Sequence, residues 1–218
     1  MIHRKTIRRG LGKMKHENVW ERLVESTIKI GARDGIEKVT TRKIAAGAGL
    51  AEAYIYQHCK DKTELFEETF MEIRSRIGKT LEYAASRLDP ETAHVDYIAR
   101  ILWCAYWNYL LEHEEELRFF LNFHHSGYFT EQMAHRWPES FMTFGRLMVE
   151  MDRLYHVSSV TNVPVMIVHI ETGTMDLALA YLRGQIPQTQ EEVETVYRAI
   201  MKPLMDDVGL SVELDESK

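Results

Sequence analysis

The stretch from Thr40 to Lys62 constrains the fold of this chain more than any other. Two short helical runs, Thr41–Gly47 and Ala51–His58, meet there at a tight corner formed by Ala48 and Gly49. Helices this short are not stable alone in water, so both need a further helix to pack on. Two short helices joined by a glycine corner are typical of a helix-turn-helix. The neighbouring sequence therefore has to provide the supporting helices.

Apolar residues recur at helical spacing on both sides of this motif. The segment Glu17–Ala32 predicts an amphipathic helix before it. Thr40 stands at the N-cap position of the first short helix, where its hydroxyl can accept from a backbone amide. Asp61 and Glu64 form a capping box, which predicts a long helix over residues 61–88. These helices would enclose the motif in a three-helix head.

Helical spacing also fills the C-terminal part of the chain. No alternating strand pattern and no internal repeat occur in the sequence. The sequence therefore predicts an all-α fold of about nine helices, with a head of three and a body of six. After the long helix, the predicted body helices cover residues 92–113, 114–127, 138–155, 162–183 and 189–208, with a separate turn at 130–135.

The net charge of −6 argues against a nucleic-acid partner when it is taken alone, but its distribution does not. Residues 1–62 hold 14 Lys and Arg against 7 Asp and Glu, whereas residues 63–218 hold 13 against 26. A basic head on an acidic body is typical of a protein that faces DNA with one end, with chance clustering as the alternative. Residues 1–16 carry six Lys or Arg and no acid. They predict a basic arm along phosphates or in a minor groove, or else a disordered tail.

The two cysteines, Cys59 and Cys104, form no disulfide framework, which indicates reduced thiols in a cytoplasmic protein. Cys59 is expected to be a small buried hydrophobe, with a redox sensor as the alternative. No run of about 18 apolar residues is present, and the basic N-terminus lacks the apolar segment of a secretory signal. We therefore expect a cytoplasmic location and no transmembrane helix.

The residues from Ile44 to Leu65 follow the pattern I-A-x-x-A-G-L, then Y-x-H-C and K-x-x-L. They resemble the helix-turn-helix of TetR-family transcriptional regulators, whose members show I-A-x-x-A-G-V-S, Y-x-H-F and K-x-x-L at this spacing. Two positions depart from the family pattern. Ala51 stands where the family has a serine cap, which should cost about 1 kcal/mol of helix stability. Cys59 replaces a phenylalanine, which should loosen the packing of the head.

The resemblance implies that residues 51–58 form a recognition helix in the major groove of DNA. Gln57 could pair with adenine, Glu52 could accept from cytosine N4, and Ala53 could touch a thymine methyl. Arg42 would reach guanine or a phosphate. A solvated acid is the alternative for Glu52, and packing on the first short helix is the alternative for Tyr54. The residues implied to contact DNA are Arg42, Lys43, Glu52, Ala53, Tyr54 and Gln57, together with Thr40, Thr41, Tyr56, His58 and Lys62, which match family positions on phosphates.

The same resemblance implies a homodimer on a palindromic operator and a repressor that releases DNA when its body binds a small molecule. Residues 17–62 would form the DNA-binding domain, residues 63–210 the ligand-binding and dimerisation domain, and residues 211–218 a flexible tail. The dimer would form through the last two long helices, where Gly173 and Ala178 would allow close approach.

The predicted body is rich in aromatic side chains, so the effector should be apolar or aromatic, or cationic if Glu171 anchors it. Plain hydrophobic core is the alternative role for these side chains. The candidates for effector binding are Trp103, Tyr106, Trp107, Phe120, Phe123, His124, Tyr128, His169 and Glu171.

Catalysis and metal binding have little support in the sequence. Glu91 and His94 have the spacing of one half of a di-iron site, but the second half is missing. The adjacent His124 and His125 would not face each other on a helix. We therefore expect no catalytic residue, no metal and no cofactor. An architectural DNA-binding protein that does not respond to small molecules is the alternative to a regulator.

Overall fold

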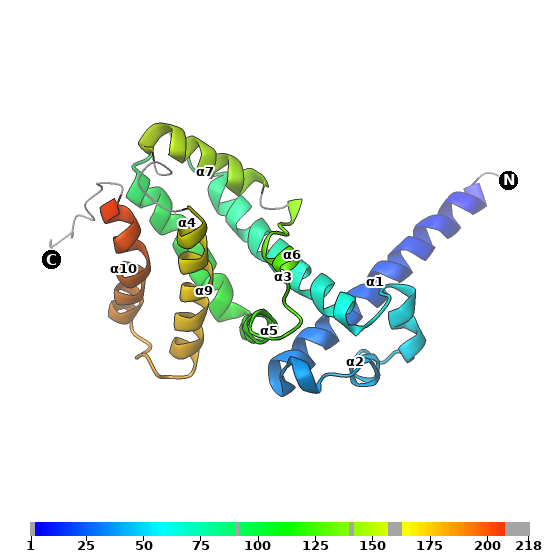
Figure 1. Ribbon diagram of the computed structural model, residues 1–218. Coiled ribbons are helices and arrows are strands. Elements are labelled where there is room, and N and C mark those ends of the chain that lie inside the picture. The colour runs from blue at the N-terminus through cyan, green and yellow to red at the C-terminus, as the bar shows by residue number, and fades with distance from the viewer. Residues whose placement is uncertain (1–2, 90–91, 140–141, 157–162, 208–218) are drawn as a thin grey trace. The chain divides into compact units, whose positions relative to one another are not determined.

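A computed structural model describes residues 3–89, 92–139, 142–156 and 163–207 of the chain. These residues form nine α-helices and two short 3₁₀-helices, and the described ranges contain no strand (Figure 1). The prediction of an all-α fold is therefore confirmed. The predicted tail at residues 211–218 and Glu91 lie outside the described residues.

The chain divides into two compact units. We call residues 1–73 and 118–136 the head unit, and residues 74–117 and 137–218 the body unit. The division by packing places the first turns of the long helix and residues 118–136 with the head. The predicted functional boundary between residues 62 and 63 stays a prediction.

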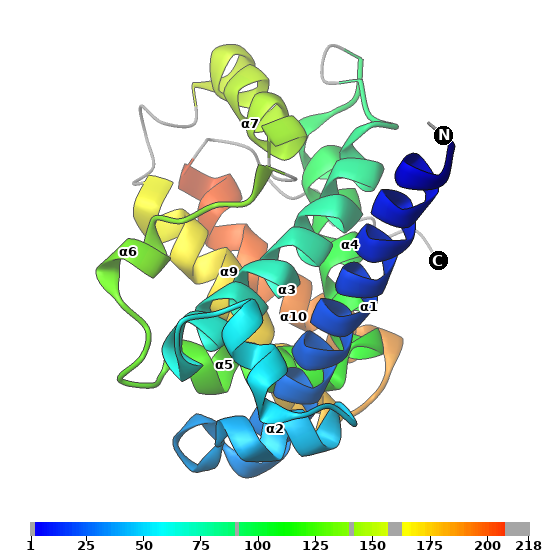
Figure 2. The ribbon, with the colours of Figure 1, turned by 90° about the vertical axis from the view of Figure 1, so that its right-hand side faces the viewer.

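The head unit contains the predicted helix-turn-helix and the elements packed around it. Its elements are α1 (His3–Asp34), η1 (Ile36–Lys38), α2 (Thr41–Gly47), η2 (Glu52–Gln57), the first turns of α3 (Lys62–Ala85), the end of α5 (Glu114–His124) and α6 (Glu131–Ala134). Helix α2 packs against the C-terminal half of α1, where α1 turns into η1 (Figure 2).

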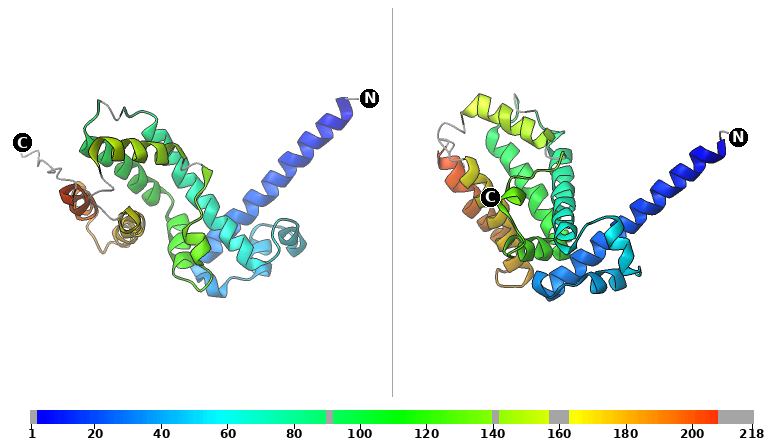
Figure 3. Two further views of the ribbon diagram at one scale, coloured as in Figure 1. Left: turned by 45° about the horizontal axis from the view of Figure 1, so that its top comes forward. Right: turned by 45° about the vertical axis from the view of Figure 1, so that its right-hand side comes forward.

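Helix α1 begins at His3, so the predicted start at Glu17 was wrong and most of the predicted basic arm is helical (Figure 3). Residues 3–16 contain no proline and six Arg or Lys, which propagate a helix well, although Gly10 and Gly12 oppose it. The helix ends where expected, because Gly35 follows it with φ of 79°, in the left-handed region that glycine favours.

The second short helix also differs from its prediction. It spans Glu52–Gln57 as a 3₁₀-helix rather than Ala51–His58 as an α-helix. Ala51 precedes it and provides no side-chain hydrogen bond, as the absent serine predicted. Six residues without a cap fit the tighter 3₁₀ form, which proteins use in short pieces.

Helix α3 begins as its capping residues predicted. Asp61 Oδ1 accepts from the Glu64 amide at 2.9 Å, and Glu64 Oε2 accepts from the Lys60 amide at 2.5 Å. The helix starts at Lys62 and ends at Ala85, three residues before the predicted end at Leu88.

The body unit combines the rest of α3 with four further helices and the start of α5. These helices are α4 (Val95–Glu112), α7 (Met142–Tyr155), α9 (Val163–Leu182) and α10 (Gln190–Asp207). Helices α9 and α10 lie side by side and both contact α4 (Figure 1). An apolar cluster joins α3, α4 and α7 through Ala85, Val95, Ile98, Leu102 and Met151.

Small residues bring α9 and α10 together within one chain. A Cβ added to Gly173 would lie 3.1 Å from Ile200 Cδ1, and Ala178 is fully buried. Gly173 therefore faces α10 of its own chain, and the predicted close approach of two copies at these residues stays a prediction.

Helix α9 is long and apolar enough to cross a membrane by length and composition alone. Its window Val165–Leu182 has a mean hydropathy of 1.3, and 22% of the window is buried. Glu171 and Asp176 interrupt this window, so it contains no uninterrupted apolar run of the length that predicts a transmembrane helix from sequence. Helices in the core or at an interface of soluble proteins can be equally long and apolar. The low buried share of this window shows that α9 has much uncovered apolar surface.

Candidate nucleic-acid interface

The first helix of the motif is fixed by its apolar side and by two side chains of α1. Ile44 of α2 is fully buried. The Ser26 hydroxyl donates to the Ile44 carbonyl at 2.8 Å. Arg22 Nη2 donates to the Ala48 carbonyl at 2.5 Å and to the Gly49 carbonyl at 3.3 Å. The Ile44 carbonyl also accepts from the Ala48 amide at 2.9 Å, whereas the Ala48 and Gly49 carbonyls lie beyond the last residue of α2, so α1 holds the corner of the motif.

The second helix of the motif is anchored by one residue and exposes the others. Ile55 is fully buried, whereas Ala53, Tyr54, Tyr56 and Gln57 are exposed. A 3₁₀-helix with a single apolar anchor leaves most of its side chains available to a ligand. This exposed surface of η2, together with the exposed Arg42 at the start of α2, is the candidate nucleic-acid interface.

Thr40 has the predicted cap role. Its hydroxyl oxygen accepts from the Lys43 amide at 3.2 Å. The hydroxyl proton is not used in this bond, so Thr40 can also donate to a phosphate oxygen.

Lys43 and Lys62 have ammonium groups that bond within the head unit. Lys43 Nζ lies 3.2 Å from Asp34 Oδ2 and 3.2 Å from the Lys38 carbonyl. Lys62 Nζ donates to the Val39 carbonyl at 3.3 Å. Each ammonium has three protons, so these contacts use only part of its capacity.

Aromatic rings also hold Lys62. Its ammonium lies 5.0 Å from the ring centroid of Tyr128 and 5.5 Å from that of Phe66, within the range of cation–π attraction. Tyr128 was predicted to contact an effector, and the structure places it against a predicted phosphate contact.

Thr41, Glu52 and His58 are turned toward the interior of the motif. The Thr41 hydroxyl donates to Glu52 Oε1 at 2.5 Å, and both residues are half-buried. His58 lies against Trp20 of α1, with 5.7 Å between ring centroids. The predicted DNA-contacting residues therefore divide into an exposed set on η2 and α2 and a set that also makes contacts inside the head.

Cys59 is buried, as predicted for a small hydrophobe, with an exposed fraction of 4%. Burial raises the pKa of its thiol to about 12, and the neighbouring carboxylates Glu64, Glu68 and Asp61 raise it further. A redox-sensing thiol needs a thiolate near neutral pH, so the environment of Cys59 disfavours that alternative.

Five of the nine effector candidates lie in the body unit, where they contact neighbouring helices. Trp103 and Trp107 of α4 stack with 5.2 Å between ring centroids. The Trp103 ring meets Tyr197 of α10 at 5.2 Å, and the Trp107 ring meets Tyr181 of α9 at 5.4 Å. Trp103 Nε1 donates to Thr174 Oγ1 at 3.3 Å. These aromatic rings form the core between α4, α9 and α10.

Polar contacts accompany this aromatic core. Arg74 Nη2 lies 3.2 Å from Glu171 Oε2, and the Tyr106 hydroxyl donates to the Glu171 carbonyl at 3.1 Å. Burial raises the pKa of Glu171, although the Arg74 cation opposes that shift. His169 Nε2 lies 3.0 Å from the Ile200 carbonyl. Glu171 therefore already has a cationic partner within the chain.

The other four candidates lie in the head unit. Phe120 and Phe123 of α5 are fully buried, with ring centroids 4.3 Å and 5.1 Å from that of Phe70. The ring centroids of His124 and Phe129 lie 4.5 Å apart. The effector candidates thus form two separate clusters, one in each unit, and a common binding site for all nine stays a prediction.

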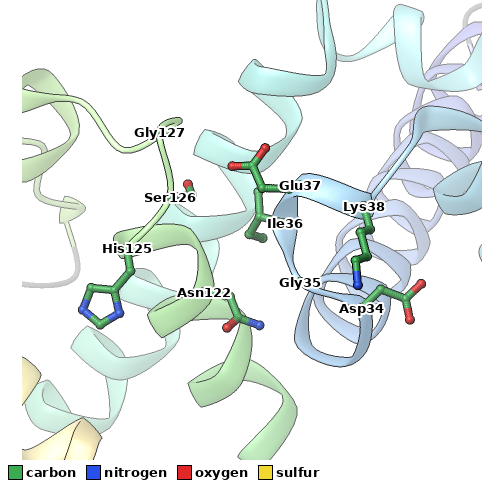
Figure 4. A pocket seen from close by; sticks show the side chains of 9 residues that line it. All are labelled: Asp34, Gly35, Ile36, Glu37, Lys38, Asn122, His125, Ser126 and Gly127. Carbon is green, nitrogen blue, oxygen red and sulfur yellow. The ribbon is translucent and has the colours of Figure 1, made fainter.

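An open pocket of about 340 Å³ lies in the head unit. Figure 4 shows it between the turn at residues 34–38 and the end of α5, with Asn122, Ser126 and Gly127 on the α5 side. The effector candidates do not line this pocket. Among the described residues, no cluster of three or more His, Cys, Asp or Glu has a metal-binding arrangement.

The comparisons with known proteins agree with this geometry. The sequence profile of the bacterial regulatory proteins of the tetR family matches residues 23–69, which contain α2, η2 and the first turns of α3. The helix-turn-helix region of this chain therefore resembles that of the tetR family.

A curated relative and solved structures extend the comparison. The HTH-type transcriptional regulator AcrR of Shigella flexneri is 30% identical over 74 residues, so the chain spans about a third of the length of this curated relative. A TetR family transcription regulator from Marinobacter aquaeolei VT8 has a TM-score of 0.72 at 20% identity, over 88% of this chain and 97% of that one. The regulator FadR from Bacillus subtilis, solved with stearoyl-CoA, has a TM-score of 0.64 at 13% identity, over 86% of this chain and 98% of that one. At these identities the structural likeness shows the fold.

The TetR-family pattern did not predict how α1 supports the motif. Arg22 and Ser26 hold the carbonyls at the end of α2, yet neither belongs to the motif. Ser26 lies one turn after Arg22, and it is 7% exposed among the apolar residues of α1. A polar residue on the apolar side of the predicted helix was the available signal.

Proposed function

We propose that this protein is a transcriptional repressor of the TetR family that binds a palindromic DNA operator as a homodimer and is released by a small molecule. The observation that carries the proposal is the exposed surface of η2, where Tyr54, Tyr56 and Gln57 surround the single anchor Ile55. A basic head with exposed hydrogen-bonding side chains is suited to the major groove of DNA. A cytoplasmic location follows from such a target.

Base contact by Gln57 gives the sharpest test of DNA recognition. An operator is first selected from random duplex DNA with the unaltered protein, and affinities are then measured at fixed salt. Gln57→Ala should weaken operator binding by about 5- to 100-fold, the range of one bidentate base contact, and leave binding to random DNA unchanged. Gln132→Ala, at an exposed position of α6, is the matched control and should change neither affinity. Equal losses on both DNAs would contradict base contact.

Uncovered apolar surface on α9 supports the proposed dimer. Val165, Ile167 and Val168 are 64%, 37% and 58% exposed, at the start of the apolar window of α9. A patch of this kind marks an interface, and homodimers are the commonest assembly that covers one. On α10, Val196, Tyr197 and Ile200 are buried within the chain, and Leu204 is half-buried.

Light scattering after gel filtration tests this interface. The unaltered protein should elute as a dimer at micromolar concentration. Val168→Glu should raise the dimer dissociation constant by about tenfold or more, because it buries a charge in an apolar contact. Val149→Glu on α7, where the native side chain is 70% exposed, is the matched control and should leave the dimer intact. A monomeric wild type, or equal effects of both substitutions, would contradict the proposal.

The chemistry of the body unit bears on the effector. Its aromatic core favours an apolar or aromatic molecule. Arg74 already neutralises Glu171, so a cationic effector would have to displace an ion pair. The B. subtilis FadR structure contains stearoyl-CoA, and long acyl thioesters are therefore reasonable first probes, besides aromatic compounds.

An architectural DNA-binding protein is the second candidate function. The observation in its favour is the dense packing of the effector candidates, whose aromatic rings contact one another and their neighbours as core side chains do. Titration of acyl thioesters, fatty acids and aromatic compounds into the operator complex separates the two functions. Release by one of them at a saturable concentration supports a regulator. Retention of DNA with every compound, together with no change in thermal stability, supports the architectural function.

A further inference from the structure

The two elements of the helix-turn-helix are joined by one side-chain hydrogen bond. Thr41 is the first residue of α2 and Glu52 the first residue of η2. The Thr41 hydroxyl donates to Glu52 Oε1 at 2.5 Å. Glu52 is half-buried, whereas Ala53 and Gln57 on the same short helix are exposed. The carboxylate thus turns toward α2 rather than outward with the exposed residues.

The number of hydroxyl protons decides what Thr41 can do. A threonine hydroxyl has one proton, and phosphate oxygens only accept. While Thr41 donates to Glu52, it has no proton left for a phosphate. Thr40 differs, because it accepts from the Lys43 amide and keeps its proton.

The start of η2 needs such a contact. Ala51 stands at the N-cap position but makes no side-chain hydrogen bond there, and Ile55 is the single buried residue of η2. A helix of six residues with one anchor can rotate about that anchor unless a second contact fixes it. The bond from Thr41 to Glu52 is such a contact at the start of η2, and His58 against Trp20 is another contact directly after its end.

We propose that Glu52 is a positioning residue that fixes η2 against α2 through Thr41, so that the exposed side chains of η2 reach the bases in one orientation. Glu52 itself does not read a base, and Thr41 does not contact a phosphate. This inference rests on the proposed DNA-binding function.

Variants of the two residues separate positioning from direct contact. Glu52→Gln keeps an acceptor for Thr41 and removes a negative charge near the phosphates. It should tighten operator and random DNA together, leaving their affinity ratio within about twofold of the wild type. Glu52→Ala and Thr41→Val should each lower that ratio by about fivefold, the effect of one lost hydrogen bond. The double variant should be no worse than either single one, and Thr41→Ser should restore the wild-type ratio.

Three results would overturn the proposal. A change of preference at one base pair in Glu52→Gln would show that Glu52 reads that base. A uniform loss of affinity in Thr41→Val, with Glu52→Ala unaffected, would show that Thr41 contacts a phosphate. Additive losses in the double variant would show that the two residues act separately.

A measurement without DNA distinguishes failure of this inference from failure of the proposed function. If the bond joins α2 to η2, the urea midpoint should fall by similar amounts in Glu52→Ala, Thr41→Val and the double variant. Wild-type protein that binds no DNA but shows this pattern would reject the DNA-binding proposal and keep the positioning contact. Unchanged midpoints in all three variants would reject the contact.

Discussion

Replacing Gly31 by alanine tests the packing that supports the motif. Gly31 lies in the C-terminal part of α1, where it faces α5 in the head unit. A Cβ added there would lie 2.6 Å from Phe119 Cδ2, 2.9 Å from Phe119 Cε2 and 3.2 Å from Ile36 Cδ1. Carbon atoms pack at about 3.5–4.0 Å, so the added methyl group needs Phe119 to move by roughly 1 Å.

The surroundings of Phe119 resist that movement. Its ring is fully buried and lies 6.4 Å from the ring of Phe66 and 6.2 Å from that of Phe123. Forcing an extra methyl group into such packing costs about 1–3 kcal/mol. The alanine also gains about 1 kcal/mol in helix propensity. A shift of α5 would lengthen the 3.0 Å bond from Asn122 Nδ2 to the Gly31 carbonyl, which contributes about 1 kcal/mol. Because the gain in helix propensity and the lost hydrogen bond nearly cancel, the net loss in free energy of unfolding should be about 1–3 kcal/mol.

Urea unfolding followed by far-ultraviolet circular dichroism measures this loss. Gly127→Ala is the control, because an added Cβ there meets no atom within 4 Å, and it should change stability by less than about 0.5 kcal/mol. Phe119→Leu should relieve the clash, so the double variant should be at least about 1 kcal/mol more stable than the sum of the single effects. Stabilisation by Gly31→Ala, or additivity of the two substitutions, would refute this account of the packing.

Three further predictions concern the cap of α2, the buried thiol and the buried acid. Thr40→Ala should lower the free energy of unfolding by about 1 kcal/mol in urea, whereas Thr40→Ser should retain it, because the serine hydroxyl also caps. In a variant with Cys104→Ser, Cys59 should react slowly with a thiol reagent in the folded protein and rapidly in urea, because burial raises its pKa to about 12; rapid labelling of the folded protein would contradict this. Burial raises the pKa of Glu171, so the stability of the wild type relative to Glu171→Gln should be greatest at acidic pH and should fall as pH rises through that raised pKa, as measured by thermal unfolding; a relative stability that rises with pH would contradict this.

The parts of the fold predicted well from the sequence depend on local signals. Thr40 caps α2, Asp61 and Glu64 open α3, and Gly35 ends α1, each within a few residues of the predicted position. A cap acts on amides two or three residues away, so the sequence contains both partners of the interaction. The prediction of the start of α1 failed because its basic residues also fit a disordered arm. Composition alone did not distinguish a solvated helix from a coil.

The parts predicted poorly depend on contacts between distant residues. The effector candidates were grouped by residue type, but the structure divides them between two units. Trp103 meets Tyr197, 94 positions later, and Glu171 meets Arg74, 97 positions earlier. No periodic pattern contains such a pairing, because it depends on how the helices pack. The bond from Thr41 to Glu52 is nearer in sequence, yet it crosses the corner of the motif, whose geometry the residue types did not specify.

The distribution of charge in the head requires a similar distinction. The excess of Lys and Arg over residues 1–62 predicted a DNA-facing surface, but several of those cations bond within the head. Arg22 holds the end of α2, Lys43 contacts Asp34, and Lys62 contacts the Val39 carbonyl and two aromatic rings. The slope of DNA affinity against salt concentration depends on the number of phosphates that the protein neutralises, and not on the net charge of the domain. A small salt slope would therefore be consistent with this head, and it would show that its basic residues stabilise the motif as well as face the DNA.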